Sequence, residues 1–261
     1  MTWWSAAFLG VLQGLTEFLP VSSSGHLALA QMLIPGFRQP GVVFDAMLHV
    51  GTAVAVVWYE RHHIVEWIGT RSGRRLLGLV AAGTVATAAV AFPLRPFAVA
   101  AFVRPLWVGV ALLVTGGVVA STARLPGGTS DENRMTWRQA MMVGLVQGLA
   151  IFPGLSRSGV TIATGLASGL ERSWSARFSF LLAVPAVIAV AVFELVGVWQ
   201  SPLKPPNGFG FACLIGATTA AVTGFFALKL VIKTVSSRVF HRFAWYCIPL
   251  GLLVLGWGWL R

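Results

Sequence analysis

Long apolar runs limit how this chain can fold more than any other feature. Only 10% of its residues are charged and 56% are hydrophobic, whereas a soluble domain carries about 25% charged residues. Six runs approach the roughly 20 apolar residues that a helix needs to cross a bilayer. These runs are 41–60, 75–94, 104–122, 176–199, 209–232 and 242–260. The sequence therefore predicts an all-α integral membrane protein with six full transmembrane helices.

Two further apolar regions, 1–34 and 136–171, are interrupted near their middle by Pro, Gly and Ser. Each half is too short to cross the membrane alone. Non-helical backbone at membrane depth is tolerated only where protein or a water-filled cavity surrounds it. We therefore predict that each region forms a re-entrant helix hairpin, which enters the membrane and turns back.

The basic residues predict the orientation of the chain. Most of the 19 Lys and Arg residues fall on one side of the membrane in this arrangement of spans. Few fall on the opposite side, among them Arg38, Lys204 and Arg261. Connections rich in Lys and Arg remain in the cytoplasm, so both termini are expected outside. The net charge is +11, and the basic residues lie in short segments between the apolar runs. This distribution indicates membrane topology rather than a nucleic-acid partner. The basic connections are 61–75, 122–138, 171–177 and 229–242.

An internal repeat relates the two interrupted regions. QGLTEFLPVSSSG (13–25) aligns without gaps with QGLAIFPGLSRSG (147–159), and both keep the Gln-Gly-Leu start, one Phe and the Ser-x-Ser-Gly end. Each copy holds one hairpin and then three crossing helices, so the copies have opposite orientations, as in the inverted repeats of many transporters. The expected boundaries are 1–122 for the first repeat, 123–135 for a polar linker and 136–261 for the second repeat.

The two hairpin tips are expected to meet near the middle of the membrane and bind an anion. Each tip places Ser-x-Ser-Gly before a helical segment, where serine is a favoured N-cap and unpaired N–H groups attract phosphate. Arg157 adds a cation whose planar fork suits phosphate oxygens. An arginine at membrane depth is a functional candidate. The alternative is a structural ion pair between Arg157 and Glu17.

The two copies differ where chemistry is expected to differ. Glu17 aligns with Ile151 and Ser23 with Arg157, and His26 follows the first tip. A hydroxyl near a histidine can be activated for nucleophilic attack. The carboxylate can orient that base, act as a base or hold a divalent cation. Taken alone, the serines more often cap a helix, and a single histidine is more often a hydrogen-bonded core residue.

Other polar residues carry less weight. Asp45, His49 and Thr52 either line the same cavity or mark the start of a helix at the membrane interface. The two cysteines, Cys213 and Cys247, each lie inside an apolar run. Neither a disulfide nor a metal site is expected from them.

Both motifs resemble those of a known family. QGLTEFLPVSSSGHL is similar to the first signature of the undecaprenyl-diphosphate phosphatases, membrane enzymes of the bacitracin-resistance type, and FPGLSRSGVTI is similar to the second. The similarity covers nearly the whole chain, including FDAMLHVGTAVAVVW and SARFSFLLAVPAVIAV. The resemblance implies hydrolysis of undecaprenyl diphosphate to undecaprenyl phosphate and inorganic phosphate. This reaction recycles the cell-wall lipid carrier at the bacterial inner membrane and confers bacitracin resistance.

The resemblance also implies site residues. A divalent cation, Mg²⁺ or Ca²⁺, is implied as well, with Glu17 as its candidate ligand. Gln13 stands where the family often has Glu, so it supplies no second carboxylate. The family's essential positions map to Glu17, Ser23, His26 and Arg157. The residues expected to bind the substrate are Gln13, Ser22, Ser24, Gly25, Ser156, Ser158 and Gly159.

The expected mechanism begins with a diphosphate that enters from the outer face while its isoprenoid tail stays in lipid. A serine, by preference Ser23, attacks the terminal phosphorus, and His26 or Glu17 takes its proton. Attack by an activated water is the competing route. A second class of function is an inverted-repeat anion transporter or lipid-carrier flippase. Phosphate release by pure protein in detergent micelles separates the two classes, because nothing can be transported there.

Overall fold

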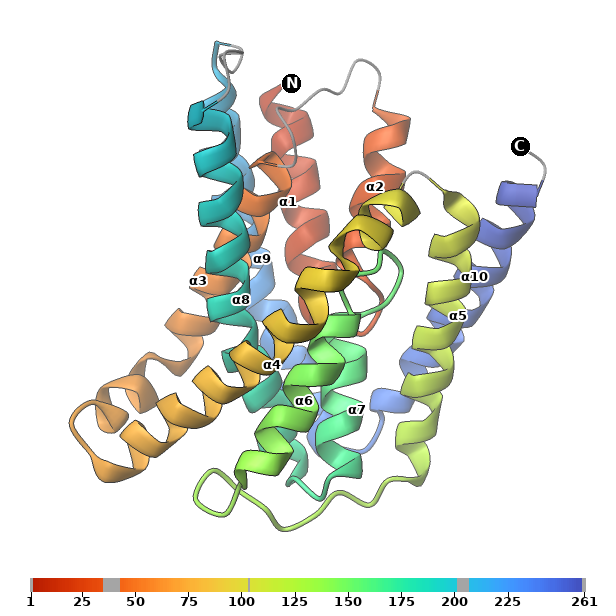
Figure 1. Ribbon diagram of the computed structural model, residues 1–261. Helices are drawn as coiled ribbons and strands as arrows, with labels where there is room; N and C mark the ends of the chain where they lie inside the picture. The colour runs from red at the N-terminus through yellow and green to blue at the C-terminus, as the bar shows by residue number, and fades with distance from the viewer. Residues whose placement is uncertain (1, 35–42, 103, 201–206, 260–261) are drawn as a thin grey trace.

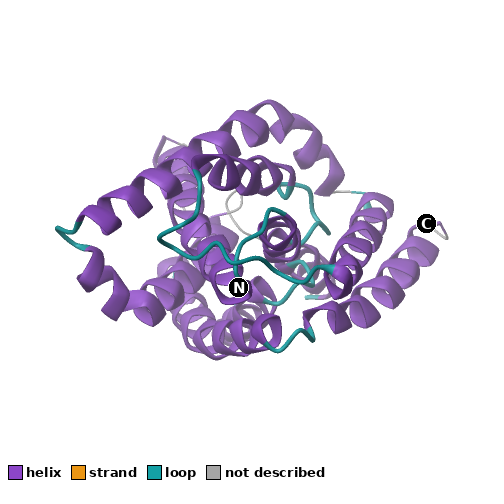
Figure 2. Ribbon diagram, turned by 90° about the horizontal axis from the view of Figure 1, so that it is seen from below, coloured by secondary structure: helices purple, strands orange, loops and turns teal. Residues whose placement is uncertain are grey.

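The computed structural model describes residues 2–34, 43–102, 104–200 and 207–259. These residues form α-helices joined by turns and loops, with 3₁₀ helices at Thr122–Arg124 and Phe240–Phe243, and no strand occurs among them (Figure 2). The predicted all-helical class is therefore confirmed for the described residues. The helices are α1 Trp3–Phe18, α2 Ser23–Leu33, α3 Val43–Trp67, α4 Arg71–Phe102, α5 Pro105–Ser121, α6 Trp137–Leu149, α7 Arg157–Ala167, α8 Arg172–Gln200, α9 Phe209–Ser236 and α10 Ala244–Trp259.

Four segments are long and apolar enough to cross a membrane by length and composition, so the chain is a multi-pass membrane protein. Two of the six predicted spans are not among these four segments. The helix α3 has 25 residues but carries charged side chains along its second half, and α10 has 16 described residues, fewer than the roughly 20 that a crossing needs. The count of six spans therefore stays a prediction. The four supported spans are Arg71–Ala101, Pro105–Arg124, Arg172–Gly197 and Phe209–Ser236.

Each interrupted region forms a helical hairpin, α1 with α2 and α6 with α7 (Figure 1). A proline, Pro20 or Pro153, lies in each break, where its missing N–H opposes a continuous helix. The second helix of each hairpin starts at a serine N-cap. Ser22 Oγ accepts the Gly25 N–H at 3.4 Å, and Ser156 Oγ accepts the Gly159 N–H at 3.2 Å. The two hairpins are thus confirmed as backbone structure, and their depth in a membrane stays a prediction.

Close helix packing holds the hairpins in place. The helix α1 packs mainly on α9, and α6 packs mainly on α4. A Cβ atom on Gly14 would overlap the Thr223 hydroxyl and the Ala220 carbonyl of α9. Small residues of this kind let helix backbones approach in membranes, where no hydrophobic force drives helices together. The rotation of α1, and with it the direction of every side chain on that helix, is therefore set by α9.

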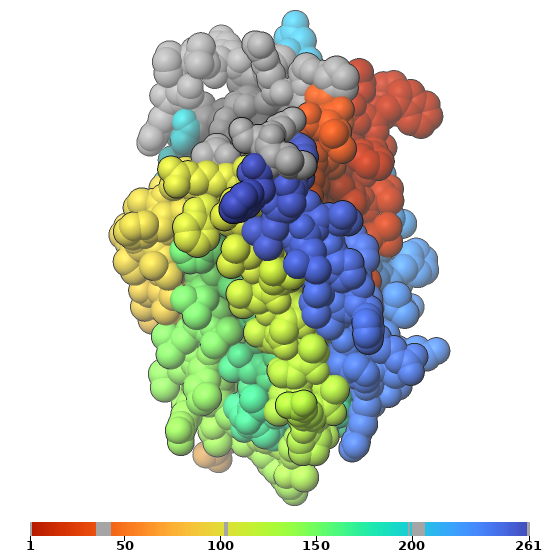
Figure 3. All heavy atoms as spheres, turned by 90° about the vertical axis from the view of Figure 1, so that its right-hand side faces the viewer, coloured from red at the N-terminus to blue at the C-terminus, as the bar shows by residue number. Residues whose placement is uncertain are grey.

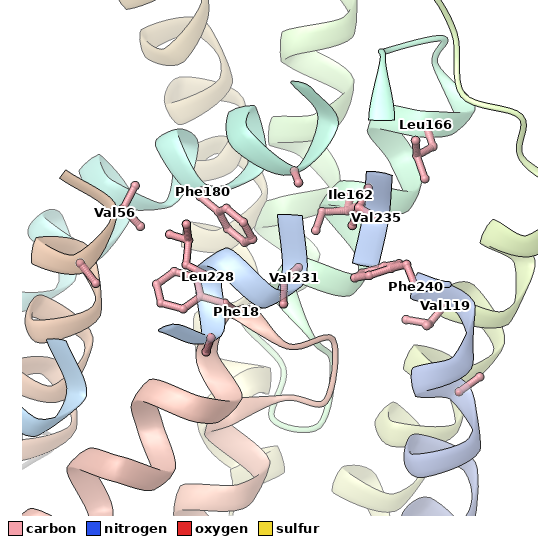
Figure 4. Packing of buried hydrophobic residues seen from close by; sticks show 14 residues of the cluster. Phe18, Val56, Val119, Ile162, Leu166, Phe180, Leu228, Val231, Val235 and Phe240 are labelled. Carbon is pink, nitrogen blue, oxygen red and sulfur yellow. The ribbon is translucent and has the colours of Figure 1, made fainter. Parts of the chain in front are cut away.

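A buried apolar cluster lies directly behind the first break. The Phe18 and Phe180 rings meet edge to face with centroids 5.2 Å apart, and Leu228 packs beside them (Figure 4). Edge-to-face aromatic pairs add to the stabilisation that comes from area burial. Phe18 is the last residue of α1, so this cluster anchors the end of the helix that carries Glu17.

The basic connections gather at one end of the molecule, and α1 begins and α10 ends at the other (Figure 1). Arg75 donates to the carbonyls of Glu132 and Met135, which joins the first connection to the linker. Arg172 donates to the Pro126 and Val235 carbonyls and so ties three connections together. Arg38, Lys204 and Arg261, predicted for the opposite side, lie outside the described residues.

The contact between α1 and α9 predicts the effect of a single methyl group. Gly14→Ala is expected to lower the stability of the purified protein by about 1–3 kcal/mol, because overpacking forces the helices apart. Gly117→Ala is the matched control, since a Cβ there meets no atom within 4 Å. The measurement is the midpoint of thermal unfolding in detergent. Equal midpoints for the two variants would contradict the packing.

Candidate active site

The two hairpin tips touch each other. Ser22 Oγ, besides capping α2, accepts the backbone N–H of Gly154 in the second break at 3.1 Å. In return, Ser158 donates its hydroxyl to the Leu19 carbonyl in the first break at 3.1 Å. Thr115 of α5 supports the second tip, because its hydroxyl donates to the Gly154 carbonyl at 2.9 Å. The expectation that the tips meet is therefore correct.

A single buried carboxylate joins the polar residues of both tips. Glu17, whose side chain is 6% exposed, accepts an N–H of Arg157 on Oε1 at 2.6 Å. Its other oxygen, Oε2, accepts the Ser23 hydroxyl at 2.6 Å and the Gln13 side-chain amide at 2.9 Å. Charge-assisted hydrogen bonds of this kind are the strong ones. The ion pair that the sequence left as one of two interpretations of Arg157 is therefore present in the structure.

Ser23 and Arg157 occupy equivalent positions, since each is the first residue of its helix, α2 or α7. Both bind the same carboxylate, so the hydroxyl, the guanidinium and the N-terminal ends of two helices lie together. Arg157 also donates to the Ser179 carbonyl at 3.2 Å. Within the described chain its guanidinium makes these two hydrogen bonds, and a guanidinium has five N–H groups. The arrangement has donors and a helix dipole available for an anion.

A small pocket borders this cluster. Its polar side is formed by Glu17 and Arg157, and its walls come mainly from α3 and α8. The walls are mainly apolar, so the charged groups of the pocket are confined to this one side. The lining residues are Glu17, Phe18, Thr52, Ala53, Val56, Arg157, Ala183, Val184 and Val187.

Two residues of α3 belong to the site although the sequence left their role open. His49 Nε2 lies 3.6 Å from Glu17 Oε2, and Thr52 lines the pocket. The sequence feature that could have assigned them to the site is the spacing of Asp45, His49 and Thr52, which places all three on one helix face. Asp45 itself accepts from the Gln31 side chain at 2.5 Å. No sequence signal pointed to Ser179, which contributes only a backbone carbonyl.

The remaining predicted residues surround the cluster in different ways. Gly25 and Gly159 donate their N–H groups to the two caps. Ser24 Oγ lies 3.4 Å from Ser22 Oγ, and Ser156 Oγ lies 3.2 Å from Ser158 Oγ.

His26 is placed apart from these groups. Its Nδ1 lies 2.8 Å from the Ser22 carbonyl and its Nε2 lies 2.7 Å from the Tyr246 hydroxyl. In the described chain, neither ring nitrogen is hydrogen-bonded to Ser23 or Glu17. The structure thus brings Glu17, Ser23 and Arg157 together and turns the His26 imidazole toward α10.

The side chains around Glu17 do not provide a set of ligands that would hold a metal ion without the substrate. No group of three His, Cys, Asp or Glu side chains able to hold a metal ion occurs in the described residues. Divalent Mg²⁺ and Ca²⁺ prefer several oxygen ligands, and here one carboxylate is already bound by the guanidinium of Arg157. A second cation beside that guanidinium meets charge repulsion. No step of the chemistry is therefore assigned to a metal ion held by the protein alone.

The fold and the site define a class: multi-pass helical membrane proteins in which two broken-helix hairpins bring a serine, a carboxylate and an arginine together. Residues 6–253 match the family described as bacitracin resistance protein BacA, and the chain belongs to that family. It is 39% identical to an undecaprenyl-diphosphatase of Syntrophotalea carbinolica over 96% of this chain and 97% of the relative.

Other relatives agree with this assignment. The undecaprenyl-diphosphatase of Desulforudis audaxviator is 39% identical, over 95% of this chain and 94% of the relative. That of Methanosphaera stadtmanae is 35% identical, over 96% of each chain. The family predicted from the two motifs is therefore confirmed.

The buried ion pair predicts a pattern of stability. Glu17→Gln and Arg157→Gln are each expected to destabilise the fold by about 3–5 kcal/mol, because each leaves one charge buried without its partner. The double variant removes both charges and is expected to unfold at a higher temperature than either single variant. The measurement is thermal unfolding in detergent. Additive losses in the double variant would mean that the two charges are not coupled.

Proposed function

We propose that this chain hydrolyses undecaprenyl diphosphate to undecaprenyl phosphate and inorganic phosphate. One observation carries the proposal: Ser23 of one hairpin and Arg157 of the other bind the two oxygens of the same carboxylate. Undecaprenyl-diphosphatase is also the name of relatives that match nearly the whole chain. The enzyme recycles the lipid carrier of cell-wall synthesis and thereby protects against bacitracin.

The contacts support the following catalytic roles. Arg157 and the N-terminal ends of α2 and α7 bind the phosphates and stabilise the charge that develops in the transition state. Ser23 Oγ attacks the terminal phosphorus and gives its proton to Glu17, which lies 2.6 Å away. The geometry favours Glu17 over His26 for this step, since His26 binds the Ser22 carbonyl and Tyr246 instead.

The bonds change in two steps. In the first, the bond from Ser23 Oγ to phosphorus forms, the bond from that phosphorus to the bridging oxygen breaks, and undecaprenyl phosphate leaves. In the second, water displaces Ser23 from phosphorus, both protons of the water leave with the inorganic phosphate, and Glu17 returns its proton to the serine oxygen. Direct attack by a water molecule that Glu17 activates is the competing route, and it needs no covalent intermediate.

The proposed topology has six crossing helices and two re-entrant hairpins in an inverted repeat, 1–122 and 136–261, joined by the linker 123–135. Equivalent contacts support the repeat: both α2 and α7 begin at a serine cap, and α1 on α9 mirrors α6 on α4. The gathering of basic connections at one end supports a cytoplasmic location for that end. Both termini and the opening of the site then face outward from the bacterial inner membrane.

The divalent cation also belongs to the proposal. With one carboxylate in reach, the cation is expected to arrive bound to the diphosphate of the substrate and to take most of its ligands from phosphate oxygens. Magnesium and calcium both fit that description. The protein's part is to bind the phosphates with Arg157 and the hairpin N–H groups.

Phosphate release from undecaprenyl diphosphate by the pure protein in detergent micelles tests the reaction. We expect Arg157→Ala to lower turnover by about 10³-fold, as does loss of an arginine that stabilises phosphoryl transfer. Turnover by Ser23→Ala is expected to fall by a similar factor. Ser237→Ala is the control, because Ser237 is an exposed residue directly after α9. Acid quench with labelled substrate is expected to trap phosphate on Ser23.

The other outcomes are distinct. Near-normal turnover by Ser23→Ala, with Arg157→Ala inactive, would establish attack by water. No phosphate release from the wild-type protein in micelles, with magnesium and with calcium, would favour the transporter or flippase function.

Labelling in intact cells tests the topology. In a chain with Cys213 and Cys247 replaced by alanine, Thr2→Cys is expected to react with a membrane-impermeant maleimide, because Thr2 precedes α1 at the outer end. Ser237→Cys lies at the basic end and is expected to react only after lysis. Reaction of Ser237→Cys in intact cells would reverse the proposed orientation.

A further inference from the structure

The helix α10 reaches the tip of the first hairpin, although its Tyr246 follows His26 by 220 residues. The Tyr246 hydroxyl lies 2.7 Å from His26 Nε2, and the two rings stack at 15° with centroids 5.7 Å apart. The next residue, Cys247, donates its thiol to the Pro20 carbonyl at 3.0 Å. Elsewhere α10 packs mainly on α5, as Figure 3 shows. Two adjacent residues thus form a specific contact with the tip.

The hydrogen bonds of His26 define its role. A carbonyl oxygen only accepts, so the bond to the Ser22 carbonyl requires a hydrogen on Nδ1. The remaining nitrogen, Nε2, faces Tyr246. A phenol hydroxyl both donates and accepts, so this bond persists whether the imidazole is neutral or protonated. The ring is therefore held at both nitrogens in either state.

The Ser22 carbonyl is a point where such support matters. Ser22 has φ +68°, in the left-handed region, and a non-glycine residue held in an unfavourable backbone conformation costs about 1–3 kcal/mol. The same residue caps α2 and binds Gly154 of the other hairpin, and it directly precedes Ser23. A shift of this carbonyl moves both the hydroxyl that contacts Glu17 and the N–H groups at the start of α2.

We propose that Tyr246 is a positioning residue for the reaction. Its hydroxyl orients His26, which holds the Ser22 carbonyl and thereby fixes Ser23 against Glu17. Tyr246 itself does not touch the phosphates. The inference rests on the proposed phosphatase activity, and it assigns to the C-terminal helix a part in the site that neither motif contains.

The variant Tyr246→Phe removes one oxygen and keeps the ring. We expect kcat for undecaprenyl diphosphate to fall about 10-fold, since small misplacement of a reacting group costs up to about 10²-fold. KM is expected to change less than twofold. Tyr59→Phe is the matched control, because it changes the only other tyrosine, whose ring packs on Phe225 rather than on His26. An unchanged kcat, or a higher KM with kcat retained, would overturn the proposal.

A double-mutant cycle shows whether Tyr246 acts through His26. In a His26→Ala background, Tyr246→Phe is expected to change kcat less than twofold, because the hydroxyl has lost its partner. A loss of the same size in both backgrounds would mean that Tyr246 acts by another route, and the proposal would be wrong.

The same cycle can be followed by thermal unfolding in detergent, which needs no turnover. A contact between the two side chains predicts non-additive shifts in the unfolding midpoint, and additive shifts would contradict it. The outcomes for the two proposals are distinct. A wild-type protein that releases no phosphate would refute the proposed function, whereas an active wild type with a fully active Tyr246→Phe would refute only the role of Tyr246.

Discussion

The ion pair between Glu17 and Arg157 joins the two hairpins, and the rest of the site depends on it. Removing two charges from water costs several kcal/mol per ion, and the cost is offset only where the geometry is good and further hydrogen bonds are made. Here Ser23 and Gln13 supply those bonds. The tips of both hairpins must therefore lie at the same place in the protein. Their helices break and restart at serine caps there, because a continuous helix would carry these groups past each other.

The duplicated hairpins share a scaffold and differ in chemistry. Gln13 and Gln147 occupy the same position in the two copies, and both are buried. Gln147 donates to Thr87 and to the Leu182 carbonyl, so it joins neighbouring helices. Gln13 instead donates to Glu17, a residue that the second copy replaces by Ile151. One hairpin thus carries the acid and the hydroxyl, while the other carries the arginine.

Broken helices with opposed N-terminal ends suit both transport and catalysis, since both need an anion bound at membrane depth. The contact that favours catalysis is the one between Ser23 and Glu17. A serine that only caps a helix binds backbone N–H groups, as Ser22 and Ser156 do. Ser23 instead donates to a carboxylate, the arrangement that a nucleophilic hydroxyl requires.

The sequence alone determined the helical membrane class and the family, because length, composition and motif spacing are properties of neighbouring residues. It also located the two helix breaks, while the inverted repeat built on them stays a prediction. It also predicted that the tips meet and that Glu17, Ser23 and Arg157 belong together. Only the tertiary structure placed His49 beside Glu17 and turned His26 toward Tyr246. Such contacts depend on how each helix is rotated about its axis. That rotation is set by close packing between distant segments, such as Gly14 against α9, which no local pattern encodes.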